Sequence, residues 1–418
     1  ACSSDESTTP PVAQNAPQAV AFDTYVPNAT RAGASGVMTT TTLQEKGFGV
    51  FATYTDATAY ASVSAKPNFM YNQQVGYTAA GGWAYSPLKY WPNETIHDSQ
   101  SPAAVGPSTT SSDKLSFFAY APWVNVKNTG ALNVSGTVEG TTQVGITGVS
   151  DNDATGDPTV SYTVAQYPKN SVDLLWGVAP VGGLEYKAVN GLTITVPEGA
   201  PLLNLVKPST DQKMKFLFKH ALSRIGLTVV GAFDQISAGG SKGADTKVTV
   251  ESIKIFGKNQ IGMSGVLNLN NVTAGVANWT SITKSSSDGA IFTVESTALN
   301  AKIKDAGVVA FASQPDGVTT SEQNVFNVDT KYFMVIPTGN TQMTVEITYY
   351  VQTKDDKLAG TVGSRVKNVI TKAINVNLEN NKAYNLKIIL GLTSVKLDAE
   401  VAEWEVAGNT DVNLPKNN

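Results

Sequence analysis

The strictest constraint on the fold of this chain is a run of alternating side chains in its C-terminal third. From residue 343 to residue 351 every second residue is apolar: Met343, Val345, Ile347, Tyr349 and Val351. Because successive side chains of a strand point to opposite faces, this pattern predicts a strand with one buried face. A second layer of structure must cover that face.

Shorter segments of the same kind recur along the chain and are separated by turn-rich spacers. The expected strands are 20–26, 47–54, 83–91, 115–123, 161–164, 172–178, 191–196, 227–233, 247–256, 384–392 and 395–406. Thr, Val and Gly are frequent, which suits short strands better than a helical bundle. The sequence therefore predicts a mainly β chain that folds into β-sandwiches.

One segment of the N-terminal half has a helical period instead. Its apolar residues are spaced as on one helix face: Met214, Leu217, Phe218, Ala221, Leu222 and Ile225. Ser209 and Gln212 have the spacing of a capping box, and Gly226 can close a helix in the left-handed conformation. The pattern predicts one short helix here, within the N-terminal domain.

The chain has 418 residues, which is more than one core usually serves. We expect a flexible tether over 1–19, an N-terminal β-sandwich over 20–265 and a C-terminal β-sandwich over 266–418. Residues 3–17 are mostly Ser, Thr, Pro, Gln and Ala, a composition that does not repay the entropy of ordering.

The charge of the chain is nearly balanced, with 30 Lys and Arg against 34 Asp and Glu. This balance gives no reason to expect a nucleic-acid partner. No stretch of 18 apolar residues occurs, so no transmembrane helix is expected.

Cys2 is the only cysteine, so no disulfide can form within the chain. The start Ala1-Cys2-Ser3-Ser4 resembles the end of a bacterial lipobox after removal of a signal peptide. Position 2 precedes a polar tail and is hard to bury. We expect a thioether-linked lipid on Cys2, and export of the protein to the outer membrane.

Residues that could carry chemistry are few. The two histidines have structural interpretations, because His220 falls within the predicted helix and His97 within a loop. Residues 151–157 resemble a calcium loop, but Tyr162 stands where the bidentate Glu is required, which favours a polar turn. Gly239–Gly243 lacks the spacing of a phosphate loop. We expect no enzyme, no metal and no cofactor.

Four aromatic residues gather in one segment: Trp83, Tyr85, Tyr90 and Trp91. Exposed aromatic rings stack on sugars, although a sandwich core uses the same residues more often. A lipid-anchored surface protein that binds glycans is therefore the alternative function.

Several segments, taken together and in order, resemble the fimbrillin family of Bacteroidales-type pili. Val20–Val26, followed by Ala29–Ala32, is similar to the family's first strand and its Arg-directed cleavage site. The other matching segments are 47–51, 68–72, 85–92 and 115–122 for strands, 218–225 for a helix, and 401–404 for the last strand before a C-terminal arm. The resemblance spans nearly the whole chain.

The resemblance implies two transthyretin-like, Greek-key β-sandwich domains in a lipoprotein precursor. It also implies a structural or adhesive subunit of a fimbria, which has other fimbrial subunits and surface receptors of host or bacteria as partners. A lone basic residue amid Ala, Thr and Gly is easy for a protease to reach. We therefore expect an Arg-specific or trypsin-like protease to cut between Arg31 and Ala32.

Removal of the first strand suggests how subunits join. The displaced face comprises Val20, Phe22, Thr24 and Val26, and a matching alternation follows in the C-terminal arm 406–418, at Val406, Gly408, Thr410, Val412 and Leu414. An arm of this period can replace the strand in another subunit. The alternative is that the arm only completes its own domain.

Overall fold

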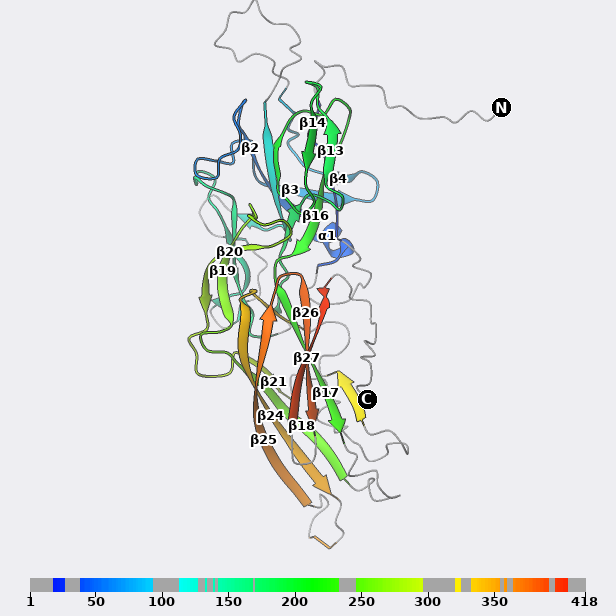
Figure 1. Cartoon of the computed structure of the whole chain (residues 1–418), viewed down its shortest axis with the longest axis vertical. Coiled ribbons are helices and arrows are strands. Elements are labelled where there is room, and N and C mark those ends of the chain that lie inside the picture. The colour runs from blue at the N-terminus through cyan, green and yellow to red at the C-terminus, as the bar shows by residue number, and fades with distance from the viewer. Residues whose placement is uncertain are drawn as a thin grey trace, which may run out of the picture.

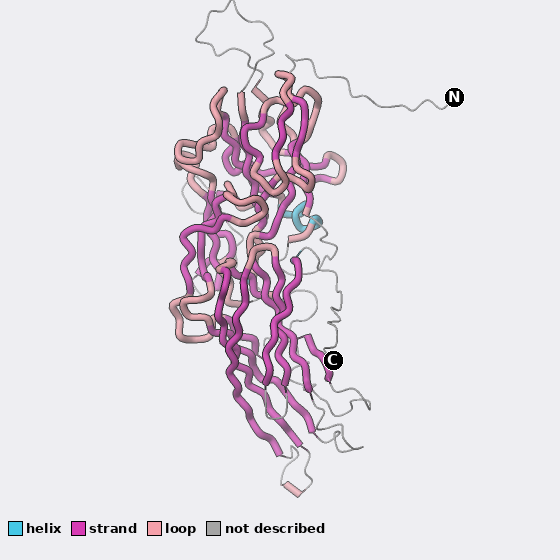
Figure 2. The backbone as a smooth tube through the Cα atoms, viewed as in Figure 1, coloured by secondary structure: helices cyan, strands magenta, loops and turns pink. Residues whose placement is uncertain are grey.

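The computed structural model is an elongated, mainly β molecule (Figures 1 and 2). It describes residues 18–26, 38–92, 113–126, 132–133, 138–139, 142–167, 170–232, 246–295, 320–324, 332–353, 357–358, 364–390 and 395–404. The predicted β class is confirmed. Within the described residues, no helix is long and apolar enough to cross a membrane.

One sheet forms the top of the molecule in Figure 1 and is called the upper sheet. Its strand order is β1-β16-β12-β5-β2-β3-β4, and β15 also pairs with β5. The strands are β1 (Phe22–Tyr25), β2 (Phe48–Tyr54), β3 (Met70–Thr78), β4 (Gly82–Ala84), β5 (Leu115–Ala121), β12 (Leu175–Val178), β15 (Leu202–Leu205) and β16 (Met214–His220).

A side sheet and several hairpins accompany the upper sheet. The side sheet has the order β10-β11-β19-β20, with β10 (Gly145–Val149), β11 (Thr159–Thr163), β19 (Gly262–Asn268) and β20 (Asn278–Lys284). The hairpins pair β13 (Leu184–Lys187) with β14 (Thr193–Val196), β6 (Asn125–Val126) with β7 (Leu132–Asn133), and β8 (Val138–Glu139) with β9 (Thr142–Gln143).

Two sheets of long strands form the lower sandwich. The first has the order β22-β17-β26-β27 with β23 beside β17, and the second the order β21-β18-β24-β25. Their bounds are β17 (Ser223–Ala232), β18 (Thr246–Phe256), β21 (Phe292–Glu295), β22 (Thr320–Asn324), β23 (Phe333–Val335), β24 (Gly339–Thr353), β25 (Ser364–Leu378), β26 (Lys382–Leu390) and β27 (Val395–Glu403). Side chains of both sheets meet in one buried cluster.

The alternating run over residues 343–351 lies in β24. Met343, Val345, Ile347 and Tyr349 are all buried in the core of the lower sandwich. The neighbouring Thr344, Glu346 and Tyr350 are only partly buried. This strand was predicted correctly because one of its faces is dry and the other is wet.

The predicted helix near residues 209–225 is wrong. Its residues form β16 and β17, and Gly226 lies inside β17 and ends no helix. Met214, Phe216 and Phe218 enter one buried cluster, whereas Leu217 enters the other. Because β16 is covered on both faces, an apolar residue interrupts its alternation and imitates a helical period. The likeness of 218–225 to a family helix fails for the same reason.

The helix that the structure does describe is α1 (Thr40–Lys46), also in the N-terminal half. Thr39 and Thr42 form its capping box, and Leu43 is buried beneath it. Gly47 ends the helix at φ +68°, where a Cβ atom would lie 2.6 Å from the Val75 carbonyl oxygen. Only glycine suits this position.

The expected strand over 83–91 is also mostly absent. Strand β4 ends at Ala84, and Tyr90 makes only an isolated bridge to Ala19. Pro87 and Pro92 cannot donate ladder hydrogen bonds, which explains the early end. In the chain, β19 and β20 follow β17 and β18 but belong to the side sheet, where β19 pairs with β11 and β20 pairs with β19. The division of the chain near residue 265 stays a prediction.

Candidate functional site at the first strand

Strand β1 lies at the edge of the upper sheet, parallel to β16. Phe22 pairs with Met214, and Tyr25 pairs with Leu217. The strand is only four residues long. It therefore occupies an edge position in which few backbone hydrogen bonds hold it.

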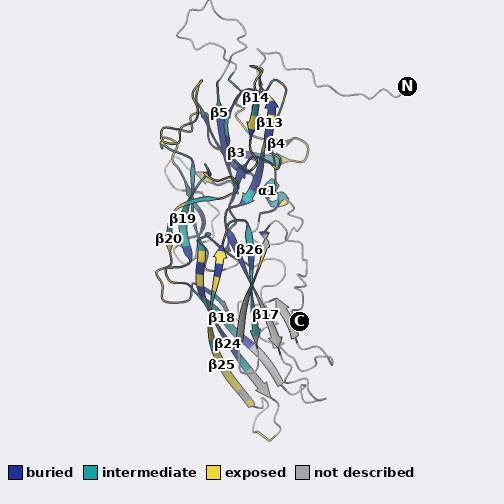
Figure 3. Cartoon of the chain, viewed as in Figure 1, coloured by how far each residue is buried: buried dark blue, intermediate teal, exposed yellow. Residues whose placement is uncertain are grey.

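Buried residues gather in strands of the upper sheet such as β5 (Figure 3), and the predicted face of β1 is buried as well. Val20 and Phe22 are each 1% exposed, Val26 is 4% exposed, and Thr24 is 8% exposed. The residues between them are partly buried. The predicted strand and its inward face are confirmed, while its removal stays a prediction.

Phe22 is surrounded by aromatic rings from four other segments. Its ring centroid lies 5.7 Å from Tyr85, 5.7 Å from Phe117, 5.9 Å from Phe216 and 6.3 Å from Phe48. These four rings are called the β1 seat. Edge-to-face and offset contacts at such distances stabilise aromatic clusters beyond the area they bury. Strand β1 thus depends mainly on its side chains.

Backbone groups also hold β1, through its four-residue ladder with β16 and through flanking hydrogen bonds. The Val20 N–H donates to the Lys89 carbonyl at 2.8 Å, and the Met214 N–H donates to the Ala21 carbonyl at 2.8 Å. The Thr24 hydroxyl donates to the Phe216 carbonyl at 3.1 Å.

Tyr85 joins the side-chain and backbone contacts of β1. Its hydroxyl donates to the Val20 carbonyl at 2.6 Å. Burial raises the pKa of this hydroxyl, so it stays protonated and remains a donor at neutral pH. Tyr85 therefore contacts β1 through both its ring and its hydroxyl.

The other predicted site residues lie outside the described residues. These are Cys2, Arg31, Ala32 and the arm residues Val406, Gly408, Thr410, Val412 and Leu414. His97 and Gly239–Gly243 also lie outside them. The last described residue, Trp404, is buried. Its neighbours show how the root of the arm is held.

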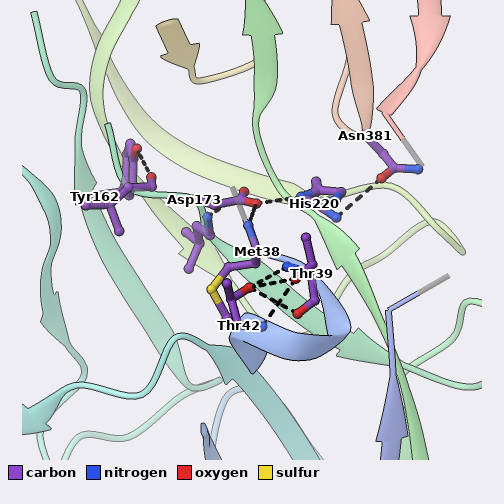
Figure 4. Close-up of polar contacts among 9 residues, drawn as sticks. Met38, Thr39, Thr42, Tyr162, Asp173, His220 and Asn381 are labelled. Atoms are coloured by element: carbon purple, nitrogen blue, oxygen red, sulfur yellow. Dashed lines mark hydrogen bonds and ion pairs between the residues drawn. The ribbon is translucent and has the colours of Figure 1, made fainter. Parts of the chain in front are cut away.

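A buried polar cluster lies where β16 ends and β17 begins (Figure 4). The Asp173 carboxylate is 0% exposed, and its Oδ2 lies 2.7 Å from Nδ1 of His220, which is 2% exposed. Oδ2 also accepts from the Met38 N–H at 2.8 Å, and Oδ1 accepts from the Leu174 N–H at 2.9 Å. Both oxygens of this buried side chain thus have hydrogen-bond partners, which offsets the cost of burying a polar group.

Trp404 closes this cluster. Its ring stacks on His220 with centroids 4.2 Å apart and 7° between the planes. The Asn381 side-chain oxygen accepts from the backbone N–H of His220 at 3.4 Å. The Asn381 backbone carbonyl accepts from the backbone N–H of Trp404 at 3.0 Å. We call Met38, Asp173, His220, Asn381 and Trp404 the junction cluster. The junction cluster thus joins Met38, which follows residues 27–37, to Trp404, which precedes residues 405–418.

Arg224 lies beside the junction cluster. Its guanidinium lies 5.3 Å from the centre of a Trp404 ring and 4.0 Å from the Tyr332 ring. Burial lowers the pKa of this guanidinium. Sequence reasoning missed these contacts, since it placed His220 and Arg224 on a helix.

The remaining candidates have structural partners. The Asp157 carboxylate accepts from the Tyr60 hydroxyl at 2.8 Å and from Asn268 Nδ2 at 3.1 Å, within the segment that resembles a calcium loop. No group of three His, Cys, Asp or Glu that could hold a metal occurs among the described residues. Of the predicted aromatic group, Trp91 is in the core, while Tyr90 is 51% exposed.

The fold is similar to that of a fimbrial protein from Bacteroides vulgatus ATCC 8482, with a TM-score of 0.56 and 18% sequence identity over 93% of this chain and 99% of that chain. At this identity the likeness shows a common fold. The tip fimbrial protein Mfa3 from Porphyromonas gingivalis, with a C-terminal truncation, is 9% identical over 89% of this chain and 97% of its own. Its TM-score of 0.28 is too low to support a conclusion. No family model and no curated protein matches the chain.

Proposed function

We propose that the protein is a structural and adhesive subunit of a cell-surface fimbria. One observation carries the proposal, namely that a short edge strand, β1, completes the apolar core of the upper sheet. The fold shared with a fimbrial protein supports the same role. The partners of such a subunit are other fimbrial subunits and receptors on host or bacterial surfaces.

Assembly proceeds by donor-strand exchange. A protease with Arg specificity cuts after Arg31, and β1 is then held only by non-covalent contacts. When β1 leaves, the rings of the β1 seat and the outer edge of β16 become exposed. Each fully buried apolar side chain contributes roughly 1.5–3 kcal/mol, so the open seat favours a replacement strand.

The C-terminal arm supplies that strand in a neighbouring subunit. Backbone hydrogen bonds to β16 give affinity, and the pockets left by Val20, Phe22 and Val26 give register. Such a contact joins unlike surfaces of two subunits, so it repeats head to tail and produces a filament. The junction cluster keeps Trp404, at the root of the arm, fixed to its own subunit.

The precursor reaches the outer membrane as a lipoprotein that carries its lipid on Cys2. Replacing Cys2 with Ala is expected to move the protein from the membrane fraction to the soluble fraction. A Cys2→Ser protein serves as a second variant without a thiol. Membrane partition equal to wild type, with no lipid-sized difference in mass, contradicts the anchor.

The protein is not an enzyme in this proposal. The one buried carboxylate–imidazole pair described, Asp173 with His220, accepts from two backbone N–H groups and is covered by the Trp404 ring. These contacts support a structural role for the pair.

An assembly experiment tests the proposal. Purified subunits are cleaved with trypsin and followed by electrophoresis and electron microscopy, and wild type is expected to form ladders and filaments. Arg31→Ala should block the start of assembly, and a chain ending at Glu405 should be cleaved but remain monomeric.

Point variants of the arm separate side-chain pockets from chain length. Val412→Asp and Leu414→Asp introduce charge on the apolar face, whereas Asn413→Asp introduces it on the opposite face and is the matched control. Filaments that form equally well from all three, or from the chain ending at Glu405, overturn exchange through this arm.

A further inference from the structure

A hollow of about 750 Å³ opens on the upper sheet beside β3 and β4. Its size falls within the range of small-molecule sites, about 300–1,000 Å³. Among its nine lining residues are Tyr71, Gln73, Gln74, Tyr85, Ser86 and Trp123. Aromatic rings, side-chain amides and a hydroxyl therefore lie together around one hollow that is open to solvent.

The hollow opens where no described strand lies on the outer side of β3. Strand β3 pairs with β2 from Met70 to Val75, while its pairing with β4 starts only at Gly76. Between Met70 and Gln73 the ladder with β2 has a bulge, and Asn72 adopts φ +41° there. Bulges of this kind redirect side chains. Here the Asn72 side chain turns inward, where its Oδ1 accepts from the Tyr120 hydroxyl at 2.6 Å.

Hydrogen bonds hold the walls of the hollow in place. The Trp123 indole N–H donates to the Asn72 carbonyl at 3.2 Å, and the Tyr71 hydroxyl donates to the Ser150 carbonyl at 2.9 Å. Gln73 Nε2 donates to the Ser86 carbonyl at 3.2 Å, which ties β3 to the opposite wall. The rings are thus oriented before any ligand arrives, which lowers the entropic cost of binding.

The chemistry of the lining selects a neutral ligand. None of the nine lining residues is Asp, Glu, Lys, Arg or His. Burial raises the pKa of Tyr71 and of Tyr85, so both hydroxyls stay uncharged at neutral pH. Half-buried aromatic rings offer flat apolar faces, and the exposed Gln74 and Ser86 offer donors and acceptors at the rim.

A ligand that fits must have an apolar face and many hydroxyl groups but no charge. We propose that this hollow binds a neutral oligosaccharide, with the Trp123 ring as the platform and the Gln74 amide as a rim contact. The site gives a ligand class to the adhesive role proposed above, and in that respect it rests on the proposed function. Binding itself requires no cleavage and no assembly.

The test uses the uncleaved full chain and isothermal titration calorimetry. The probes are the neutral trisaccharides maltotriose, cellotriose, mannotriose and N,N′,N″-triacetylchitotriose, with sialyllactose as the anionic comparator. At least one neutral probe is expected to bind saturably, with an affinity that salt does not change because no charge takes part.

Two lining variants and one control locate the binding. Trp123→Ala is expected to weaken binding about tenfold or more, the loss typical of a central aromatic anchor. Gln74→Ala, at an exposed position, is expected to weaken it severalfold without disturbing the fold. Tyr90→Ala removes an aromatic ring that is 51% exposed but does not line the hollow, and it should bind as wild type does.

Three results overturn the proposal: no neutral probe binds, only sialyllactose binds, or binding survives both Trp123→Ala and Gln74→Ala. A failure of polymerisation does not affect this assay, since the uncleaved monomer is titrated. The failure of one proposal can thus be told from the failure of the other.

Discussion

Two parallel strand pairs occur among the described pairs, which are otherwise antiparallel. Strand β1 pairs with β16 over four residues at the edge of the upper sheet. Strand β17 pairs with β26 over nine residues inside the lower sandwich, where β22 and β27 flank them. The same pairing geometry therefore serves one strand at the edge of its described sheet and another that lies between two strands.

The difference lies in what holds each strand. Strand β1 is held by a four-residue ladder on one side and by the buried side chains of Val20, Phe22 and Val26, whereas β26 has nine-residue ladders on both sides. Regions with few backbone partners open locally at a free energy below that of global unfolding. We therefore expect β1 to open locally, and β26 to open only when the protein unfolds globally.

The largest effect on stability is expected at the junction cluster, where β16 of the first parallel pair is followed by β17 of the second. Asp173→Ala removes the acceptor of two backbone N–H groups and the partner of His220 in a fully buried position. We expect a loss of about 3–5 kcal/mol in the free energy of unfolding, measured by urea denaturation.

Asp288→Ala is the control for that variant, because this carboxylate is exposed and pairs with Lys258 at 2.8 Å on the surface. It should cost less than about 1 kcal/mol. Hydrogen exchange in Asp173→Ala should quicken in β16 and β17 together. If exchange quickens in only one of them, the junction cluster does not couple the two parallel pairs.

Phe22→Ala removes the ring that fills the β1 seat, and we expect it to cost about 3–5 kcal/mol. Ile388→Ala, in β26, is the matched variant and should cost about 2–5 kcal/mol. The two should differ in exchange at the Met214 amide, which donates to Ala21. Phe22→Ala should expose this amide through local opening, and Ile388→Ala only through global unfolding. Equal protection in both contradicts the comparison.

A smaller effect on stability is expected from overpacking the core beside β16, at Gly177 in the neighbouring strand β12. A Cβ atom at Gly177 would lie 2.8 Å from Phe216 Cδ1 and 3.0 Å from Ala119 Cβ, inside the core. Gly177→Ala should therefore cost about 1–3 kcal/mol in thermal unfolding.

Gly226→Ala is the corresponding change in β17, where the new atom would lie 2.9 Å from Tyr332 Cε1. Tyr332 is only partly buried and can swing outward, so this variant should cost less than about 1 kcal/mol. A larger loss from Gly226→Ala than from Gly177→Ala reverses the expected order.

The smallest effect comes from single hydroxyl groups. Tyr85→Phe removes the donor to Val20, and Tyr384→Phe removes the donor to Asn377, each at about 0.5–1.5 kcal/mol. Burial raises both pKa values above the ordinary value of 10.0. The folded state thus prefers the protonated phenol, so the contribution is complete below about pH 10 and is lost as pH rises through the folded pKa.

The stability difference between wild type and Tyr85→Phe should therefore shrink in alkaline buffer, as seen in denaturation at increasing pH. Tyr384→Phe should show the same pH dependence. Hydrogen exchange at the Met214 amide should quicken in Tyr85→Phe but not in Tyr384→Phe. A Tyr85→Phe difference that grows with alkaline pH contradicts the assigned sign.

Strands with one wet face could be predicted from the sequence. The alternation in β24 and in Val20–Val26 can be recognised in the sequence, because polar residues such as Glu346 and Asp23 lie on the outer face. Strand β16 could not be recognised from its pattern. Its outer face is buried in a second hydrophobic cluster, and Leu217 on that face is therefore apolar as well. Periodicity reports burial on one side and becomes ambiguous when both sides are buried.

The partners of the candidate site could not be predicted in the same way. Thr24 bonds to Phe216 across 192 residues of sequence, a separation that only the sheet order explains. Asp173, His220 and Trp404 likewise come from three distant segments, and local pattern carries no record of their meeting. By contrast, the capping box of Thr39 and Thr42, followed by Gly47, is a local signal from which α1 could have been predicted.

In the proposed filament, the position of the junction cluster determines how each subunit carries tension. Strands β17, β26 and β27 run along the length of the molecule (Figure 1), but Glu403, at the end of β27, pairs with Lys382, which pairs with Ser223 at the start of β17. Trp404 therefore lies beside His220, at the end of β16. A pull between the β1 seat and the segment after Trp404 passes through β16 and the junction cluster. The long ladders of the lower sandwich lie outside this path, so the junction cluster carries the load.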